Sequence, residues 1–122
     1  MATNFIQDGD TIAWTNGTGS AVAAGSVVAI GQILGVALTT IANGASGSVA
    51  IKGVFQCPKV IAAVIAAGES LLWDVSAGKF DAKTATPATG DISGSPAVAV
   101  EAAGNGATTL KVLLTGVPGT KA

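Results

Sequence analysis

Few side chains in this sequence could do chemistry. It contains no histidine and one cysteine, Cys57. Histidine is the usual general base and the commonest metal ligand, so its absence rules out Ser-His-Asp and Cys-His catalysis and leaves zinc without a ligand set. A lone cysteine forms no intrachain disulfide, and Cys57 is interpreted as a small, half-buried side chain. We therefore expect no cofactor, no metal and no enzymatic activity.

The acidic and phosphate-binding patterns are also incomplete. Asp8 and Asp10 flank Gly9, as at the start of a calcium loop, but the remaining acidic ligands do not follow, so both are interpreted as turn residues. The dipeptide Gly78-Lys79 is followed by phenylalanine rather than by serine or threonine, so no P-loop is present. All six basic residues are scattered lysines, and the net charge is −1. Without arginine or a basic patch, nucleic-acid binding is not expected.

Four large apolar residues are the candidates for contacting a partner. Trp14 and Trp73 each belong to the core or to an interface, since tryptophan is favoured in both. Phe5 and Ile6 lie in residues 1–10, which are predicted to form a flexible N-terminal arm. These two side chains either cover the protein's own core or anchor on a neighbouring chain, where the arm adds a strand to an exposed sheet edge.

The composition favours association. Hydrophobic residues make up 49% of the chain and charged residues 11%, so a monomer would expose much apolar surface, which usually marks an interface. Residues 1–8 lack the basic start and apolar core of a signal peptide, and Val60–Ala67 is too short to cross a bilayer. We expect a protein made in a cytoplasm with no membrane partner.

Glycine-rich turns divide the chain into short alternating or β-branched segments, which is the pattern of an all-β fold. The predicted architecture is a small Gly-rich barrel or a sandwich of mostly antiparallel strands, occupying residues 11–116 as one domain. Val60–Ala67 could instead form one or two helical turns, residues 77–95 are predicted as a surface loop, and residues 117–122 as a frayed tail. The predicted strands are Thr11–Thr15, Val27–Ile30, Ile33–Thr40, Gly47–Gln56, Ser70–Asp74, Ala97–Ala102 and Thr108–Leu114.

A partial internal repeat accompanies this pattern. The segment 36–45 resembles 98–107, and the segment 23–28 resembles 66–72, with spacings of 62 and 43 residues. Asn43-Gly44 and Asn105-Gly106 fall at matching places and predict hairpin turns. We expect two similar hairpin-containing units, the second carrying an insertion.

Six segments form a pattern by their order and spacing: 2–10, 22–31, 35–37, 47–55, 72–74 and 114–116. Together they resemble a family of small phage proteins, the capsid cement or head-decoration proteins, which are often labelled as phage recombinases of the RecA/RadA type. The resemblance implies a β-rich fold, a place on the virion and oligomeric, trimeric spikes on the shell. It transfers no catalytic residue. The recombinase label is rejected, because a strand-exchange ATPase needs a P-loop and basic DNA-binding loops.

The leading functional hypothesis is therefore a structural virion protein, made in the host bacterial cytoplasm, that binds the capsid exterior. Its partners would be the phage major capsid protein and further copies of itself in a homotrimer. A receptor- or glycan-binding module of a phage tail or surface is the alternative, and it would need exposed aromatic and polar side chains in a concave site. A small hydrolase is disfavoured by the missing catalytic residues.

Overall fold

The computed structural model describes residues 10–122, and its regular structure is all β, as the sequence predicts. The segments between glycine turns form strands because β-branched and alternating residues fit a pleated, half-buried surface. Among the described residues, each one with a positive φ is a glycine, including Gly44 and Gly106 of the predicted Asn-Gly turns. The ten strands are β1 (Thr11–Thr15), β2 (Val27–Ile30), β3 (Ile33–Ala37), β4 (Ser46–Ala50), β5 (Lys52–Pro58), β6 (Ser70–Asp74), β7 (Lys79–Ala82), β8 (Ile92–Ala99), β9 (Thr109–Thr115) and β10 (Thr120–Lys121).

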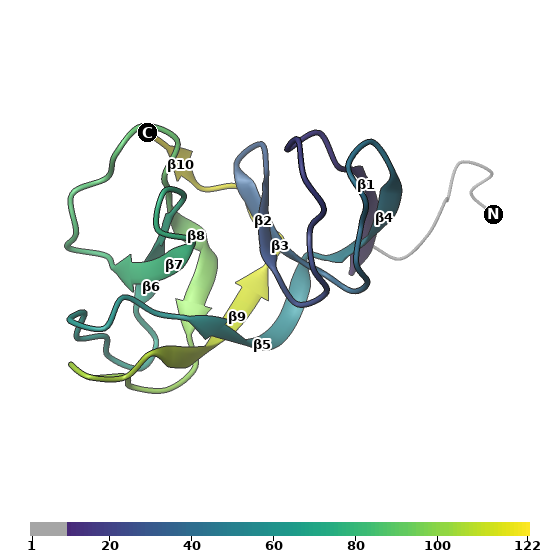
Figure 1. Ribbon diagram of the computed structural model, residues 1–122. Helices are drawn as coiled ribbons and strands as arrows, with labels where there is room; N and C mark the ends of the chain where they lie inside the picture. The colour runs from purple at the N-terminus through teal and green to yellow at the C-terminus, as the bar shows by residue number, and fades with distance from the viewer. Residues whose placement is uncertain (1–9) are drawn as a thin grey trace, which may run out of the picture.

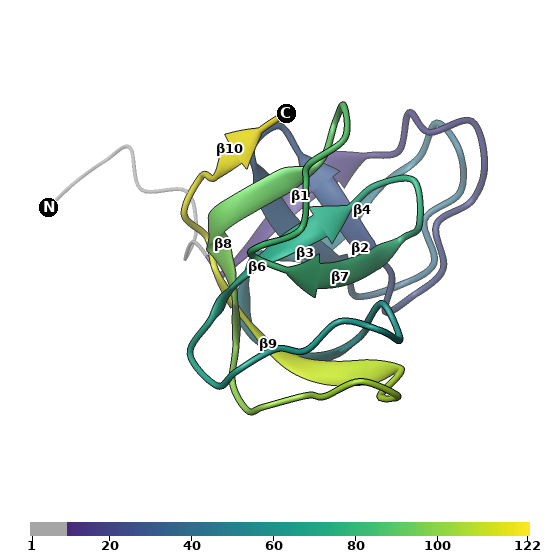
Figure 2. The ribbon, with the colours of Figure 1, turned by 90° about the vertical axis from the view of Figure 1, so that its left-hand side faces the viewer.

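The strands form two antiparallel sheets that lie side by side in Figure 1. The first sheet has the order β1-β4-β3-β2. The second has the order β5-β9-β8-β6-β7, with β10 paired to β8. Neither sheet closes into a barrel. The view turned by 90° shows the second sheet in front of the first (Figure 2).

The predicted internal repeat is present in the topology. The first unit, defined as residues 11–50, contains β1, β2, β3 and β4; the second unit, residues 52–115, contains their equivalents β5, β6, β8 and β9, in the same order within the sheet. The registers match as well, since Thr15 pairs with Ser46 as Pro58 pairs with Thr109. Outside the strands, the bridge between Val22 and Ile41 has its counterpart between Ile65 and Ala103.

The insertion in the second unit is not the surface loop that the sequence predicts for residues 77–95. Lys79–Ala82 forms β7 on the edge of β6, and β8 begins at Ile92 rather than at Ala97. Phe80 is fully buried there. Ile92 is buried as well, so two large apolar side chains anchor an otherwise small and polar segment.

The C-terminal segment is likewise ordered, so the prediction of a frayed tail is wrong. Thr120 pairs with Ser93 in β10 and β8. The Gly119 N–H donates to the Gln32 carbonyl at 2.8 Å, and the Ala122 N–H donates to the Asp91 carbonyl at 2.8 Å. This segment ties the first unit's β2–β3 turn to the second sheet.

Other predicted segments also differ from the structure. The segment Gly47–Gln56 is not one strand, because it is interrupted at Ile51, where the chain leaves the first sheet and enters the second. The third strand ends at Ala37 rather than at Thr40. Val60–Ala67 forms turns and a bridge rather than helical turns, which agrees with its β-branched content.

The core is divided unequally between the units. Paired residues share a sheet face, so the first sheet has a Val36 face (Leu34, Val36, Ala50) and an opposite Val49 face (Val28, Ala37, Val49). The Val49 face forms a small core with Ile41. The Val36 face instead contributes Leu34 and Val36 to a larger core made mainly by the second unit.

The second unit's contribution comes from the face of its sheet that corresponds to the Val49 face of the first, named here the Val112 face. Val112 pairs with Phe55 and with Ala99, and these side chains lie in or against the larger core. The two units thus pack through non-equivalent faces: the Val36 face of the first lies on the Val112 face of the second.

Candidate partner-binding surface

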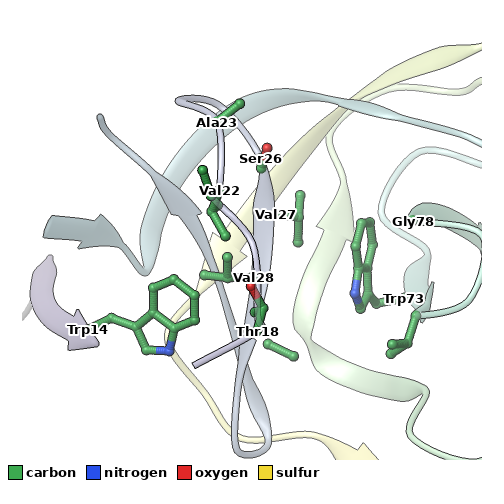
Figure 3. A pocket seen from close by; sticks show the side chains of 12 residues that line it. Trp14, Thr18, Val22, Ala23, Ser26, Val27, Val28, Trp73 and Gly78 are labelled. Atoms are coloured by element: carbon green, nitrogen blue, oxygen red, sulfur yellow. The ribbon is translucent and has the colours of Figure 1, made fainter. Parts of the chain in front are cut away.

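A groove with a volume of about 550 Å³ lies where the two units meet. Trp14 lies at one end of it and Trp73 at the other, with Val22, Val27 and Val28 between them (Figure 3). Part of the groove is formed by β2, an edge strand of the first sheet. The structure therefore brings together two tryptophans that the sequence analysis treated separately.

The two tryptophans differ in burial. Trp73 is 6% exposed and packs on Phe80 with ring centroids 4.8 Å apart and planes tilted by 60°, a favourable aromatic arrangement. Trp14 is half-buried against the small core of the first unit. Trp73 thus serves the core and presents one edge to the groove, whereas Trp14 has surface left for a partner.

The polar wall of the groove is held by a buried asparagine. Asn16 is fully buried, and its Oδ1 accepts hydrogen bonds from the Thr18 N–H at 2.9 Å and the Thr18 hydroxyl at 2.7 Å. Its Nδ2 donates to the Ser20 and Ile41 carbonyls at 2.8 and 2.9 Å. Because both ends of the amide are satisfied, Thr18 is fixed at the groove.

The chemistry available in the groove is limited to contact. None of its twelve lining residues has an ionisable side chain. Thr18 and Ser26 supply hydroxyls, and the rest of the lining consists of alanines, valines, the two tryptophans and a glycine. Such a groove accepts apolar side chains or an extended chain, and it holds no group for acid–base work.

A second exposed apolar surface lies on the second unit, on the face opposite the Val112 face. Val54 pairs with Leu113, which in turn pairs with Val98, so the three form a row across β5, β9 and β8. Val54 is 55% exposed and Leu113 40% exposed. We call these three residues the Val98 row. It was not predicted from the sequence, although Leu113, an apolar residue at an exposed position, interrupts the alternation of polar and apolar residues along β9.

Buried ionisable groups in the described residues have structural partners. Lys59 is 1% exposed, and its ammonium donates to the carbonyls of Val60, Ala107 and Ile61 at 2.8, 3.2 and 3.4 Å. The Asp91 carboxylate accepts from the backbone N–H groups of Val75 and Ala88 at 3.1 and 2.9 Å. Both side chains satisfy loop backbone that would otherwise be buried without partners.

Cys57 and Asp74 have shifted pKa values, each with a structural cause. Burial raises the pKa of the Cys57 thiol to about 11, so the thiolate needed for nucleophilic chemistry is scarce at neutral pH. Hydrogen bonds from the Ala77 N–H and the Ser76 hydroxyl lower the pKa of Asp74 at a turn. Across residues 10–122 there is no group of three or more His, Cys, Asp or Glu side chains placed to bind a metal ion. No helix in that part of the chain is long and apolar enough to span a membrane.

Of the four predicted partner-binding residues, the structure places two. Trp14 and Trp73 both line the groove, although 58 residues of sequence lie between them. Phe5 and Ile6 lie outside the described residues. The Val98 row adds a surface that was not among the sequence candidates.

Comparison with known proteins supplies the family. A search of curated proteins found no match. The family model for phage cement proteins matches residues 6–114, which is most of the 122-residue chain and includes β1 to β8 and nearly all of β9. The all-β fold agrees with the expectation drawn from the resemblance. The chain therefore belongs to the phage cement protein family, a family of structural phage proteins that associate with the capsid.

Proposed function

We propose that this protein binds the outer surface of the phage capsid, stabilises the shell and has no catalytic activity. The observation that carries the proposal is the family match over residues 6–114. The groove between the units agrees with it, because its lining offers contact surface without ionisable groups.

Stabilisation follows from differential binding. A protein that bridges neighbouring shell subunits binds the assembled lattice and not the free subunits, so it shifts the equilibrium toward the shell by mass action. Many copies on one lattice act together, which lets each contact be modest. A homotrimer fits this role because it matches the local three-fold positions of a shell, and we propose that state for the protein.

The proposed capsid contacts are the four residues named from the sequence. Phe5 and Ile6, in the N-terminal arm of residues 1–10, anchor on the major capsid protein. Trp14 and Trp73 contribute through the groove that they line. Trp14 is the better residue to test, because Trp73 is buried against Phe80 and its loss would disturb the core.

The test uses purified protein and phage shells that lack it. Sedimentation measures binding, and heating the shells measures stabilisation. We expect the native protein to bind and to raise the temperature at which shells break. The double variant Phe5→Ala/Ile6→Ala and the variant Trp14→Ala should bind at least tenfold more weakly while keeping their own unfolding transitions. Lys83→Ala, at an exposed position outside the groove, is the matched control. Absence of binding by the native protein would refute the proposal.

A further inference from the structure

The two units use equivalent faces differently. In the first unit, the Val36 face is covered by the second unit's core. The topology makes Val98 the counterpart of Val36, Leu113 the counterpart of Ala50, and Val54 the counterpart of Thr11, because the pairs Val36–Ala50 and Thr11–Ala50 recur as Val98–Leu113 and Val54–Leu113. The Val98 row is therefore the same face, left uncovered in the second unit.

The converse holds on the opposite faces. In the second unit, the Val112 face carries Phe55 and Cys57, which pack in or against the larger core together with Leu34 and Val36 of the first unit. Their counterparts on the first unit's Val49 face are Ile12 and Trp14, which pair with Val49 and Gly47. Both are half-buried, and the small core beneath that face contains first-unit residues alone. In a single copy, therefore, the Val98 row and the Val49 face each lack the packing partner that the equivalent face of the other unit has.

Charge distribution points to the same first-unit face. No charged residue occurs from Thr11 to Ile51; Lys52 is the first after Asp10. A surface without charges over a whole unit is typical of the centre of an interface, where charged residues are depleted. The Val98 row, by contrast, has Lys52 on one side and Lys111 on the other, as a polar rim around an apolar centre.

We propose that copies of this chain associate head to tail: the Val98 row of one copy packs on the Val49 face of the next, around the half-buried Ile12. Within one chain, the Val36 face of the first unit already packs on the Val112 face of the second. The proposed contact repeats this packing between two chains. The partner on the Val49 face is a second copy of this chain, because the proposed contact extends the interface that already joins the two units. A contact between two different faces is heterologous, and it closes into a ring when the rotation between successive copies completes a full turn, as it would in the proposed homotrimer. The proposal rests on the self-association proposed above and not on capsid binding.

The test compares two variants that block opposite faces. Leu113→Glu places a charge in the Val98 row, and Ile12→Glu places one on the Val49 face. Analytical ultracentrifugation of the purified proteins, without shells, should show an oligomer for the native chain and monomers for both variants, with self-association weakened at least tenfold. Val64→Glu, at an apolar position 68% exposed and outside both faces, should remain oligomeric.

Mixing the two variants tests the head-to-tail arrangement itself. Each keeps the face that the other has lost, so an equimolar mixture should give a dimer and nothing larger. If the contact joined two copies of the same face, one of the variants would still self-associate on its own through that intact face. That result would overturn the proposal, as would a mixture that stays monomeric or a monomeric native chain. If Ile12→Glu unfolds the protein, as judged by circular dichroism, Ile30→Glu on the same face takes its place. Absence of shell binding by a native chain that forms the ring would count against the proposed capsid binding alone.

Discussion

Asn16 and Lys59 occupy equivalent buried positions, each directly after the first strand of its unit. The Asn16 N–H donates to the Ala45 carbonyl and the Lys59 N–H to the Thr108 carbonyl, both at 2.8 Å. Each side chain then donates to carbonyls of loop residues in its own unit: Asn16 Nδ2 to Ile41 and Lys59 Nζ to Ala107. In both units the side chain at this position donates to backbone carbonyls of loop residues. It is an amide in the first unit and an ammonium in the second.

Replacing Lys59 by methionine should destabilise the protein. The change removes the donor that serves three carbonyls and leaves them buried without it, at a cost of about 2 kcal/mol. The free energy of unfolding in urea measures the loss. Lys83→Met, at an exposed lysine, is the control and should leave the transition unchanged. Equal stabilities for the two variants would show that the Lys59 hydrogen bonds contribute nothing.

Gly35 lies where the first sheet is most closely packed. A Cβ at this position would overlap Val49 Cγ1 and come within 3.0 Å of the Ala50 carbonyl oxygen. We expect Gly35→Ala to lower the free energy of unfolding by about 1 to 3 kcal/mol, the usual cost of overpacking. Gly104→Ala, where a Cβ meets no atom within 4 Å, should cost far less. A melt of Gly35→Ala that coincides with the Gly104→Ala melt would contradict the packing described for β3 and β4.

Cys57 should make stability depend on alkaline pH. Its thiol has a pKa of about 11 when folded, against 9.0 for the unaffected thiol, so the folded chain holds the proton more tightly. Stability from this group is therefore complete below pH 9 and is lost as the pH rises toward 11. Urea unfolding of the native protein and of Cys57→Ala at pH 8, 9.5 and 10.5 isolates the effect, since the lysines titrate in both. Parallel pH curves would exclude it.

Removing residues 117–122 should lower the unfolding temperature by several degrees. The deletion takes away β10 and the bond from the Gly119 N–H to Gln32, which links the units. Circular dichroism on heating measures the change. Lys121→Ala retains the backbone contacts and should melt like the native chain. Unchanged melting of the truncated chain would mean that the segment adds no stability.

The parts of the fold that local pattern determines could be predicted from the sequence. β1, β2 and β6 have the predicted bounds, because alternation and flanking glycines mark them. β7 and β10 were missed because they are short, and pairing with β6 and β8 is what makes them strands. In β7, the buried Phe80 and Ala82 alternate with Lys79 and Asp81, but four residues are too few to mark a strand by pattern alone. Ile51 carries no break signal such as glycine or proline, so the change of sheet there could not be seen.

The candidate site was predictable only in part. Tryptophan is informative in a chain with so few aromatics, which identified Trp14 and Trp73 individually. Their meeting at one groove depends on how the two sheets pack, and nothing local to either residue encodes that. The Val98 row depends on which sheet face stays uncovered, which is again a property of the assembled units.

The passage from the first sheet to the second takes a single residue, since β4 ends at Ala50 and β5 begins at Lys52. A linker of one residue does not allow the two units to move apart as flexibly tethered domains do. A force applied at one end of the molecule is transmitted along the backbone into the other unit. The chain therefore resists deformation, because deforming it requires breaking strand pairs rather than bending a hinge.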